Sequence, residues 1–140
     1  LPAIVVDIGT AITVDAIAKG GVFLGGAILP GRAMMKNALA RGTAQLSSLK
    51  ISSTRHPCFA GKKTAGAIAS GVENGIVGSL KYLISGIAKE CRFSKYSIVL
   101  TGGDSSFFIK SLPHCNYIKD LVLLGTAIIG ERHFTAIRAK

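Results

Sequence analysis

The first residues whose types and spacing could do chemistry are those of the segment DIGTAIT, residues 7–13. Asp7 closes an apolar run, and Gly9 and Thr10 follow it in what reads as a tight turn between two strands. A glycine lets the backbone approach a ligand, a threonine hydroxyl can meet a phosphate oxygen, and a carboxylate can hold a cation beside the phosphates. The pattern is typical of a phosphate clamp. A plain β-hairpin, in which Asp7 and Thr10 only satisfy the backbone of the turn, explains the same residues equally well.

A second glycine turn follows a later β-branched run, in the segment Thr101-Gly102-Gly103-Asp104. Two glycines clear room for a flat group, and a helix beginning at Asp104 would offer unpaired N–H groups to an anion. We expect both turns to open on the same edge of one sheet, since each lies at the end of a strand. The sequence therefore predicts a nucleotide site between Gly9 and Gly102.

The elements that must position these turns follow from apolar periodicity and from glycine and proline punctuation. We expect strands at 4–9, 12–17, 22–24, 96–101 and 116–118, and helices at 32–41, 64–89, from 104 and at 121–137. This order predicts an α/β fold with a five-stranded mixed sheet and helices on both faces, the ribonuclease-H-like architecture. The polar stretch 46–61 reads as a surface loop whose length suggests a functional role.

Thr64 is expected to cap the long helix, which carries a stripe of small residues at Ala67, Gly71, Gly75 and Gly78. Such a stripe lets another backbone approach closely. Two interpretations remain open, tight packing of the helix on the sheet and the seam of a dimer.

Composition limits the function classes. The 140 residues are 49% hydrophobic and 17% charged, which predicts one globular domain over 1–140. The net charge of +10 favours anionic ligands, but the basic residues are dispersed and not interleaved with aromatics, which argues against a nucleic-acid surface. We expect neither a signal peptide nor a membrane span, because residues 1–6 lack a basic region and no apolar run is long enough. Cys58, Cys91 and Cys115 form no pair pattern, so we expect free thiols and a cytoplasmic location.

Other candidates are weaker. His56, His114 and His133 lack ligand spacing and are expected to be surface or turn residues. Asp15 is expected to make a structural hydrogen bond, and Lys62 and Lys63 either steer an acidic substrate or are simply solvated. A two-metal nuclease needs three or four clustered carboxylates, which seven scattered acids do not suggest.

The motifs in combination carry a family resemblance. DIGTAITVD at 7–15, the segment GVFLGGAILPG at 21–31, GKKTAGAIASG at 61–71 and TGGD at 101–104 occur in the order found in type III pantothenate kinases. The chain resembles the C-terminal half of that family, which includes the Bvg accessory factors and belongs to the superfamily of acetate and sugar kinases, heat-shock-70 proteins and actin. The resemblance spans nearly all of the chain.

The resemblance implies phosphorylation of pantothenate by ATP with Mg²⁺, the first step of coenzyme A synthesis, in a homodimer activated by K⁺ or NH₄⁺. It implies that Asp7 binds the monovalent cation and that Gly9 and Thr10 contact the ATP phosphates. The resemblance also implies that Thr64 binds pantothenate and that Gly102 and Gly103 form the turn on the adenosine side of the ATP site.

The sequence departs from the family pattern at Ser47, Lys63 and Thr126, where the family usually has proline, a small polar residue and leucine. Relatives are nearly twice as long, and their first half resembles a second lobe with a DxGNT loop and a GxDR motif that supplies the general base. We therefore expect the N-terminal lobe to be absent and this chain alone to be nearly inactive, since phosphoryl transfer depends on alignment of groups from both lobes. The alternative is a non-catalytic regulatory or interaction module that keeps the kinase fold.

Overall fold

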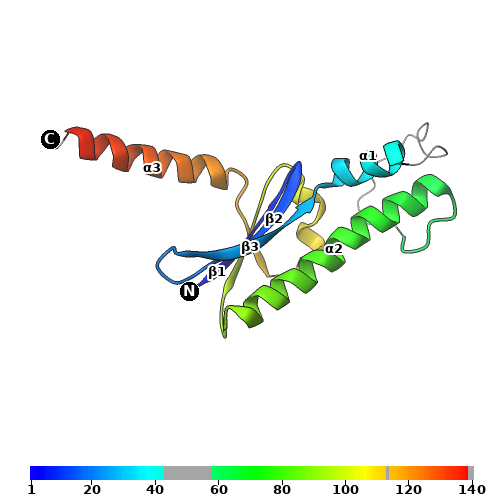
Figure 1. The fold of residues 1–140 in the computed structure, drawn as a ribbon, viewed down its shortest axis with the longest axis horizontal. Coiled ribbons are helices and arrows are strands. Elements are labelled where there is room, and N and C mark those ends of the chain that lie inside the picture. The colour runs from blue at the N-terminus through cyan, green and yellow to red at the C-terminus, as the bar shows by residue number, and fades with distance from the viewer. Residues whose placement is uncertain (43–57, 113, 139–140) are drawn as a thin grey trace.

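The computed structural model describes residues 1–42, 58–112 and 114–138, which form one mixed sheet with helices (Figure 1). The sheet has the strand order β3-β2-β1-β4-β5. Its strands are β1 (Ala3–Ile8), β2 (Ala11–Ile17), β3 (Phe23–Pro30), β4 (Ser97–Thr101) and β5 (Cys115–Tyr117). The first three strands form an antiparallel meander, and β4 and β5 run parallel to β1. The predicted five-stranded mixed sheet is confirmed, although β3 is longer than expected.

Alternation along β1 and β2 gives the sheet two different faces. Ile4, Val6 and Ile8 are fully buried on one face, as are Ile12 and Val14 beside them. The residues between them lie on the other face, as expected of strands with a period of two.

The buried face is covered by α2 (Thr64–Glu90), which runs across it while α1 (Arg32–Gly42) packs on the N-terminal part of α2 (Figure 1). Apolar residues at every fourth position of α2, including Ile68, Val72 and Ile76, form the core with the strands. Thr64 is the first helical residue, and the cap position is Lys63, which makes no side-chain cap bond. The prediction that Thr64 caps this helix is therefore wrong.

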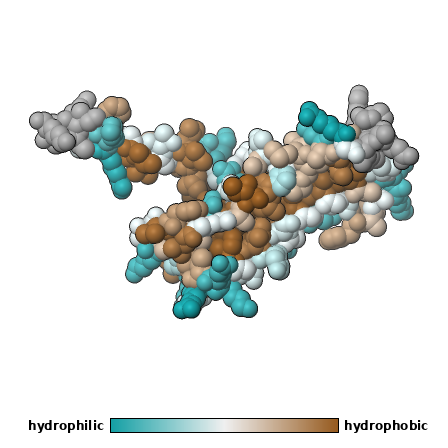
Figure 2. All heavy atoms as spheres, in the orientation of Figure 1, coloured by the Kyte–Doolittle hydropathy of each residue, from teal (hydrophilic) through white to brown (hydrophobic). Residues whose placement is uncertain are grey.

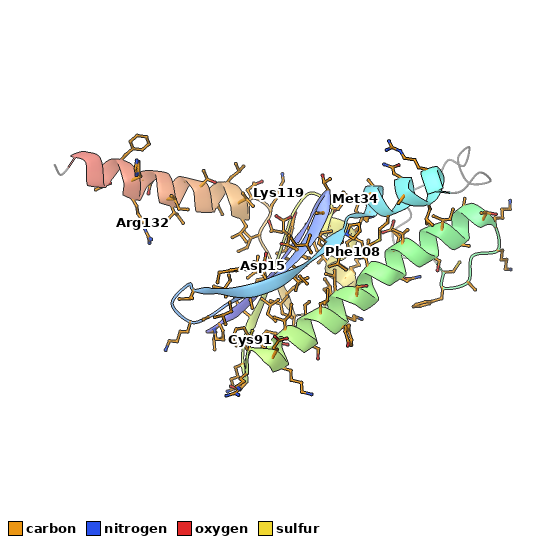
Figure 3. All side chains as sticks on the ribbon, viewed as in Figure 1. Asp15, Met34, Cys91, Phe108, Lys119 and Arg132 are labelled. Carbon is orange, nitrogen blue, oxygen red and sulfur yellow. The ribbon has the colours of Figure 1, made fainter. Side chains whose placement is uncertain are left out.

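After β4 the chain forms two short 3₁₀ turns, Ser105–Phe107 and Ile109–Ser111, instead of the α-helix expected from Asp104. Serines bond locally to the backbone and compete with α-helix formation, as the Ser105 hydroxyl does by donating to the Gly102 carbonyl at 2.5 Å. The turns still bury Phe108 between the strands and α2 (Figure 3).

The last helix, α3 (Leu121–Arg138), extends away from the sheet (Figure 1). Its apolar side chains are exposed, Leu123 and Ile129 at 68% and 69%. The prediction of helices on both faces is therefore wrong for the described residues, because α3, the candidate for the second layer, does not cover the sheet. No helix among them is long and apolar enough to cross a membrane.

Most of the predicted functional loop at 46–61 lies outside the described residues, which resume at Cys58. His56 and Ser47 also fall outside them.

Candidate functional site

Three glycine turns meet at one edge of the sheet. The β1–β2 turn at Gly9 and Thr10 is joined to the start of α1 by a 2.9 Å hydrogen bond from the Gly31 amide to the Thr10 carbonyl. The turn after β4 is joined to β1 by a 2.9 Å hydrogen bond from the Asp104 amide to the Ile8 carbonyl. The expectation that the turns at Gly9 and Gly102 share one edge is confirmed.

Gly102 is what lets the β4 turn come so close to β1. Its φ is +96°, a conformation that favours glycine, and a Cβ there would lie 2.5 Å from the Ile8 carbonyl oxygen and closer still to the Asp7 carboxylate. Gly31 is similarly confined, because a Cβ would collide with the carbonyl oxygens of Gly9 and Thr10. The close approach of these backbones thus requires the absence of side chains at both glycines.

Asp7 lies in the middle of a polar row on the face opposite α2. Thr13 on β2 and Thr101 on β4 are its register partners on either side. Thr13 donates a 2.7 Å hydrogen bond to the carboxylate of Asp15, which confirms the structural hydrogen bond expected for Asp15. The buried Thr101 hydroxyl donates to the Lys119 carbonyl at 3.3 Å. The half-buried carboxylate of Asp7 therefore stands at the strand end, next to the turns.

The turn after β4 does not present a helix N-terminus to a ligand. The Asp104 amide is bonded to Ile8, the Ser105 amide to Gly102 at 3.2 Å and the Phe107 amide to Asp104 at 3.1 Å. These three donors are used within the fold and the expected α-helix is not formed, so these amides are not the unpaired donors that were predicted, and the anion site stays a prediction. The other feature expected of this turn, room for close approach at Gly102 and Gly103, does not depend on these amides.

Thr64 lies apart from this edge, in an apolar groove of about 750 Å³ between α1 and α2. Pro30, Met34, Met35 and Val72 are among the other residues that line it. The apolar surface over these two helices is seen in Figure 2, and Met34 on α1 is labelled in Figure 3. Pro30 connects the groove to the edge, because Gly31 follows it at the Thr10 turn.

The small-residue stripe of α2 faces outward. Ala67, Gly71, Gly75 and Gly78 are exposed, and a Cβ at any of the three glycines would meet no atom within 4 Å. The interpretation that the stripe packs on the sheet is therefore wrong, and the dimer seam stays a prediction.

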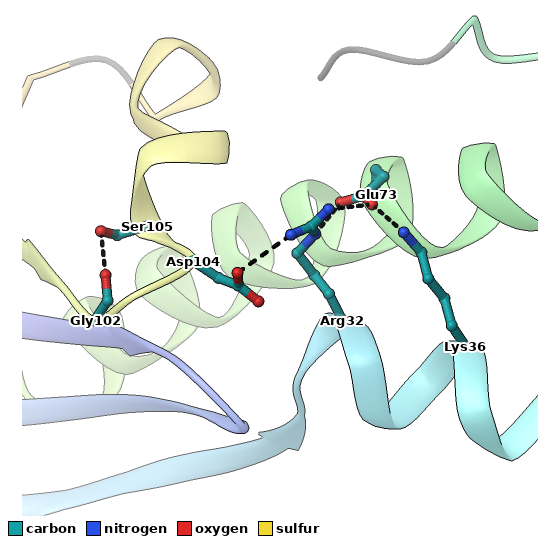
Figure 4. A network of polar contacts seen from close by, with 6 residues as sticks. All are labelled: Arg32, Lys36, Glu73, Gly102, Asp104 and Ser105. Carbon is teal, nitrogen blue, oxygen red and sulfur yellow. Dashed lines mark hydrogen bonds and ion pairs between the residues drawn. The ribbon is translucent and has the colours of Figure 1, made fainter. Parts of the chain in front are cut away.

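A buried ion cluster, which sequence reasoning missed, ties the edge to both helices (Figure 4). Arg32 donates to the Glu73 carboxylate through Nε at 2.8 Å and Nη2 at 3.0 Å, and Lys36 donates to it at 2.8 Å. Burial opposes ionisation of Glu73, but hydrogen bonds and charges from Arg32 and Lys36 outweigh it and hold the pKa of this carboxyl below its ordinary value. The sequence does contain one sign of this cluster, since Glu73 is the only charged residue in 64–80. A charge on a helix that is otherwise apolar needs a partner when it is buried.

Asp7 provides the oxygen chemistry that a monovalent cation requires. Its carboxylate and the Ile8 carbonyl oxygen both lie beside Gly102, and hard cations prefer such oxygen ligands. Within the described residues, no three His, Cys, Asp or Glu side chains come together as metal ligands. His114 and His133 are exposed, and the three cysteines are free. Asp7 and the Ile8 carbonyl are therefore oxygen groups that would suit one cation, and the part of the chain that the structure describes holds no multi-carboxylate cluster.

Comparisons with known proteins agree on one family. A family model described as type III pantothenate kinase matches residues 1–86. The chain is 42% identical over 123 residues to a type III pantothenate kinase of Legionella pneumophila, covering 87% of this chain and 47% of the relative. It is 37% identical over 122 residues to one of Fervidobacterium nodosum, covering 87% of this chain and 46% of the relative. The resemblance expected from the motifs is confirmed.

A solved structure is similar over nearly the whole chain. It is a crystal structure from Campylobacter jejuni, described as that of a conserved Baf family transcriptional activator. The similarity has a TM-score of 0.67 at 30% identity and covers 96% of this chain and 59% of that one. The chain spans about half the length of the curated relatives it matches, and it corresponds to their C-terminal half.

Proposed function

Since the chain belongs to the type III pantothenate kinase family, we propose that it supplies the C-terminal half of an enzyme that phosphorylates pantothenate with ATP. The observation that carries the proposal is the meeting of the Gly9, Gly31 and Gly102 turns at one sheet edge beside Asp7. Phosphoryl transfer needs positioned backbone and charge more than covalent chemistry. An edge of this kind supports that role.

In this proposal the turns bind the nucleotide. Gly9 lets the backbone approach the ATP phosphates, and the exposed Thr10 can donate its hydroxyl to a phosphate oxygen. Gly102 and Gly103 leave room for the adenosine side, and Mg²⁺ accompanies the nucleotide. Asp7 would hold K⁺ or NH₄⁺, which adds positive charge next to the phosphates.

Thr64 is proposed to contact pantothenate. It is exposed at the first turn of α2, and Lys62 and Lys63 precede it, so cationic side chains flank the position. An anionic substrate suits that charge. Thr64 lines the apolar groove between α1 and α2, and in this proposal a second copy of the chain completes the site there.

A homodimer is therefore part of the proposal. The outward small-residue stripe of α2 lets a partner helix approach closely, and the apolar groove between α1 and α2 lies beside it. Gly71 belongs to both the stripe and the groove.

We further propose that the fold is the second lobe of an actin-like ATPase and that a first lobe supplies the general base. Without such a lobe, residues 1–140 would be nearly inactive. The apolar side chains of α3 from Val122 to Phe134 are exposed. An isolated helix is only marginally stable in water, and an exposed apolar patch marks a contact surface, so these side chains support a partner lobe on this helix. The cytoplasmic location expected from the free cysteines belongs to this proposal as well.

A coupled kinase assay tests the proposal. The chain is mixed with pantothenate, ATP, Mg²⁺ and K⁺, alone and with a first lobe taken from a full-length relative. We expect activity only in the mixture. Inactivity of a two-lobe complex whose folding and stoichiometry have been verified would contradict the proposal.

The comparisons do not favour the alternative of a non-catalytic regulatory or interaction module. That alternative expects a stable dimer without nucleotide affinity. Calorimetric titration with ATP in K⁺ separates the two, because clear binding rejects the alternative.

A further inference from the structure

The ion cluster extends from the helices to the turn after β4. Besides its two bonds to Glu73, Arg32 donates through Nη1 to the Asp104 carboxylate at 3.2 Å (Figure 4). Its guanidinium carbon lies 3.7 Å from the centre of the Phe107 ring. Glu73 and Phe107 therefore fix the plane of the guanidinium, and the third nitrogen points at Asp104.

Arg32 is placed against local preference. It is the first residue of α1, where a cation is disfavoured by the helix dipole, and that first turn contains no acid. Its side chain is nevertheless 6% exposed. A buried arginine at this position is explained by its tertiary partners and not by helix stability.

Arg32 lies between the two other turns of the edge, one reached through its neighbour Gly31 and one through its own side chain. Gly31, directly before Arg32, donates to Thr10, which fixes the start of α1 on the β1–β2 turn. Asp104 is held twice, by its amide on Ile8 and by its carboxylate on Arg32. Arg32 thus bridges the two sides of the edge.

We propose that Arg32 is a positioning residue, oriented by Glu73, that holds the Gly102–Gly103 turn against the end of β1 through Asp104. The link to nucleotide affinity rests on the proposed function, whereas the holding of the turn does not. Lys36 contacts Glu73 and belongs to the structural part of the cluster.

Different bonds of the cluster serve the positioning role and the structural role, so single substitutions can test the two roles separately. Replacing Asp104 by alanine removes only the Arg32–Asp104 bridge and keeps the buried Arg32–Glu73–Lys36 group. Lys36→Met removes one of the Glu73 bonds and keeps the bridge to the turn. Glu131→Ala is the control for Asp104→Ala, because Glu131 is an exposed acid within α3 and its loss changes the net charge equally.

The test measures amide exchange by NMR in the intact protein, together with ATP affinity and urea unfolding. In Asp104→Ala we expect the Asp104 and Ser105 amides to exchange about fivefold faster and ATP affinity to fall by about fivefold, the effect of one half-exposed ion pair. The urea midpoint should match that of Glu131→Ala. Lys36→Met should lower the midpoint and leave ATP affinity unchanged.

Conservative substitution gives a second readout. Arg32→Lys keeps the charge but cannot reach Glu73 and Asp104 with one planar fork, so it should accelerate exchange of the same amides as Asp104→Ala does. The proposal would be overturned if the amides of residues 104 and 105 exchanged at the same rate in Asp104→Ala as in Glu131→Ala. Acceleration spread evenly over the chain would also overturn it.

The outcomes also separate this inference from the proposed function. Local acceleration in a protein that does not bind ATP supports the positioning role and rejects the kinase proposal. ATP binding together with unchanged exchange of the turn amides in Asp104→Ala and Arg32→Lys overturns the positioning role and leaves the kinase proposal standing.

Discussion

The α-carbon of Gly102 lies against the carboxylate of Asp7, so that the turn after β4 closes directly on the end of β1. This contact brings the second glycine turn to the same edge as the first. It also joins the residue proposed to hold a cation to the residue proposed to face adenosine.

Replacing Gly102 by alanine is expected to destabilise the fold by about 2–4 kcal/mol. The cause is a left-handed backbone together with a collision between the new methyl group and the backbone of Ile8. Urea unfolding measures the loss. Gly103→Ala is the control, because a Cβ there meets no atom within 4 Å, and its stability should be unchanged. Equal stability of the two variants would contradict the close approach.

Asp7→Asn should weaken ATP binding in K⁺ about tenfold, because a neutral amide holds a cation beside phosphates less well than a carboxylate. Calorimetric titration with and without K⁺ measures the effect, which should be confined to the K⁺ condition. Asp15→Asn serves as control, since Asp15 lies on the same sheet face and bonds to Thr13. A loss of equal size in Asp15→Asn would argue against a specific role for Asp7.

Acid should destabilise the protein through Glu73. Because the pKa of Glu73 is lower in the folded protein than its ordinary value, its contribution is complete above the ordinary glutamate value of about 4.3 and is lost as pH falls through the lower folded value. Urea midpoints between neutral pH and pH of about 3 measure the decline.

Glu73→Gln should flatten that decline and cost about 3–5 kcal/mol at neutral pH, because Arg32 and Lys36 then remain buried without their carboxylate. Glu90→Gln, at the exposed end of α2, is the control and should retain the wild-type profile. An unchanged slope in Glu73→Gln would show that other groups govern the acid response.

Gly75→Leu tests the dimer seam. The position is exposed and open, so leucine should raise the helix stability of the monomer by about 1 kcal/mol while its bulk blocks close approach of a partner. Sedimentation equilibrium should then show a monomer where the parent chain dimerises. Glu90→Leu, at the exposed C-terminal end of α2 and on a different helical face from the stripe, should leave the dimer intact. A dimer that survives Gly75→Leu would place the interface elsewhere.

Local patterns predicted the strands and the two glycine turns at Gly9 and Gly102 well. Alternation in β1 and β2 and the β-branched run of β4 need only near neighbours along the chain, and glycine pairs mark turns by their own conformational freedom. The outward direction of the α2 stripe could not be predicted in the same way. Small residues suit any close contact, and only the apolar face at Ile68, Val72 and Ile76 decides which side meets the sheet.

The sequence by itself determined the order of elements, the positions of the glycine turns and the family, because these depend on residue types at short spacing and on motifs that occur in a fixed order. Only the tertiary structure decided which groups meet across the chain. Arg32 and Glu73 are 41 residues apart and Arg32 and Asp104 are 72 apart, and no local pattern encodes such pairs. Their contact arises because α1, α2 and the β4 turn pack at one edge, where buried charges must find one another.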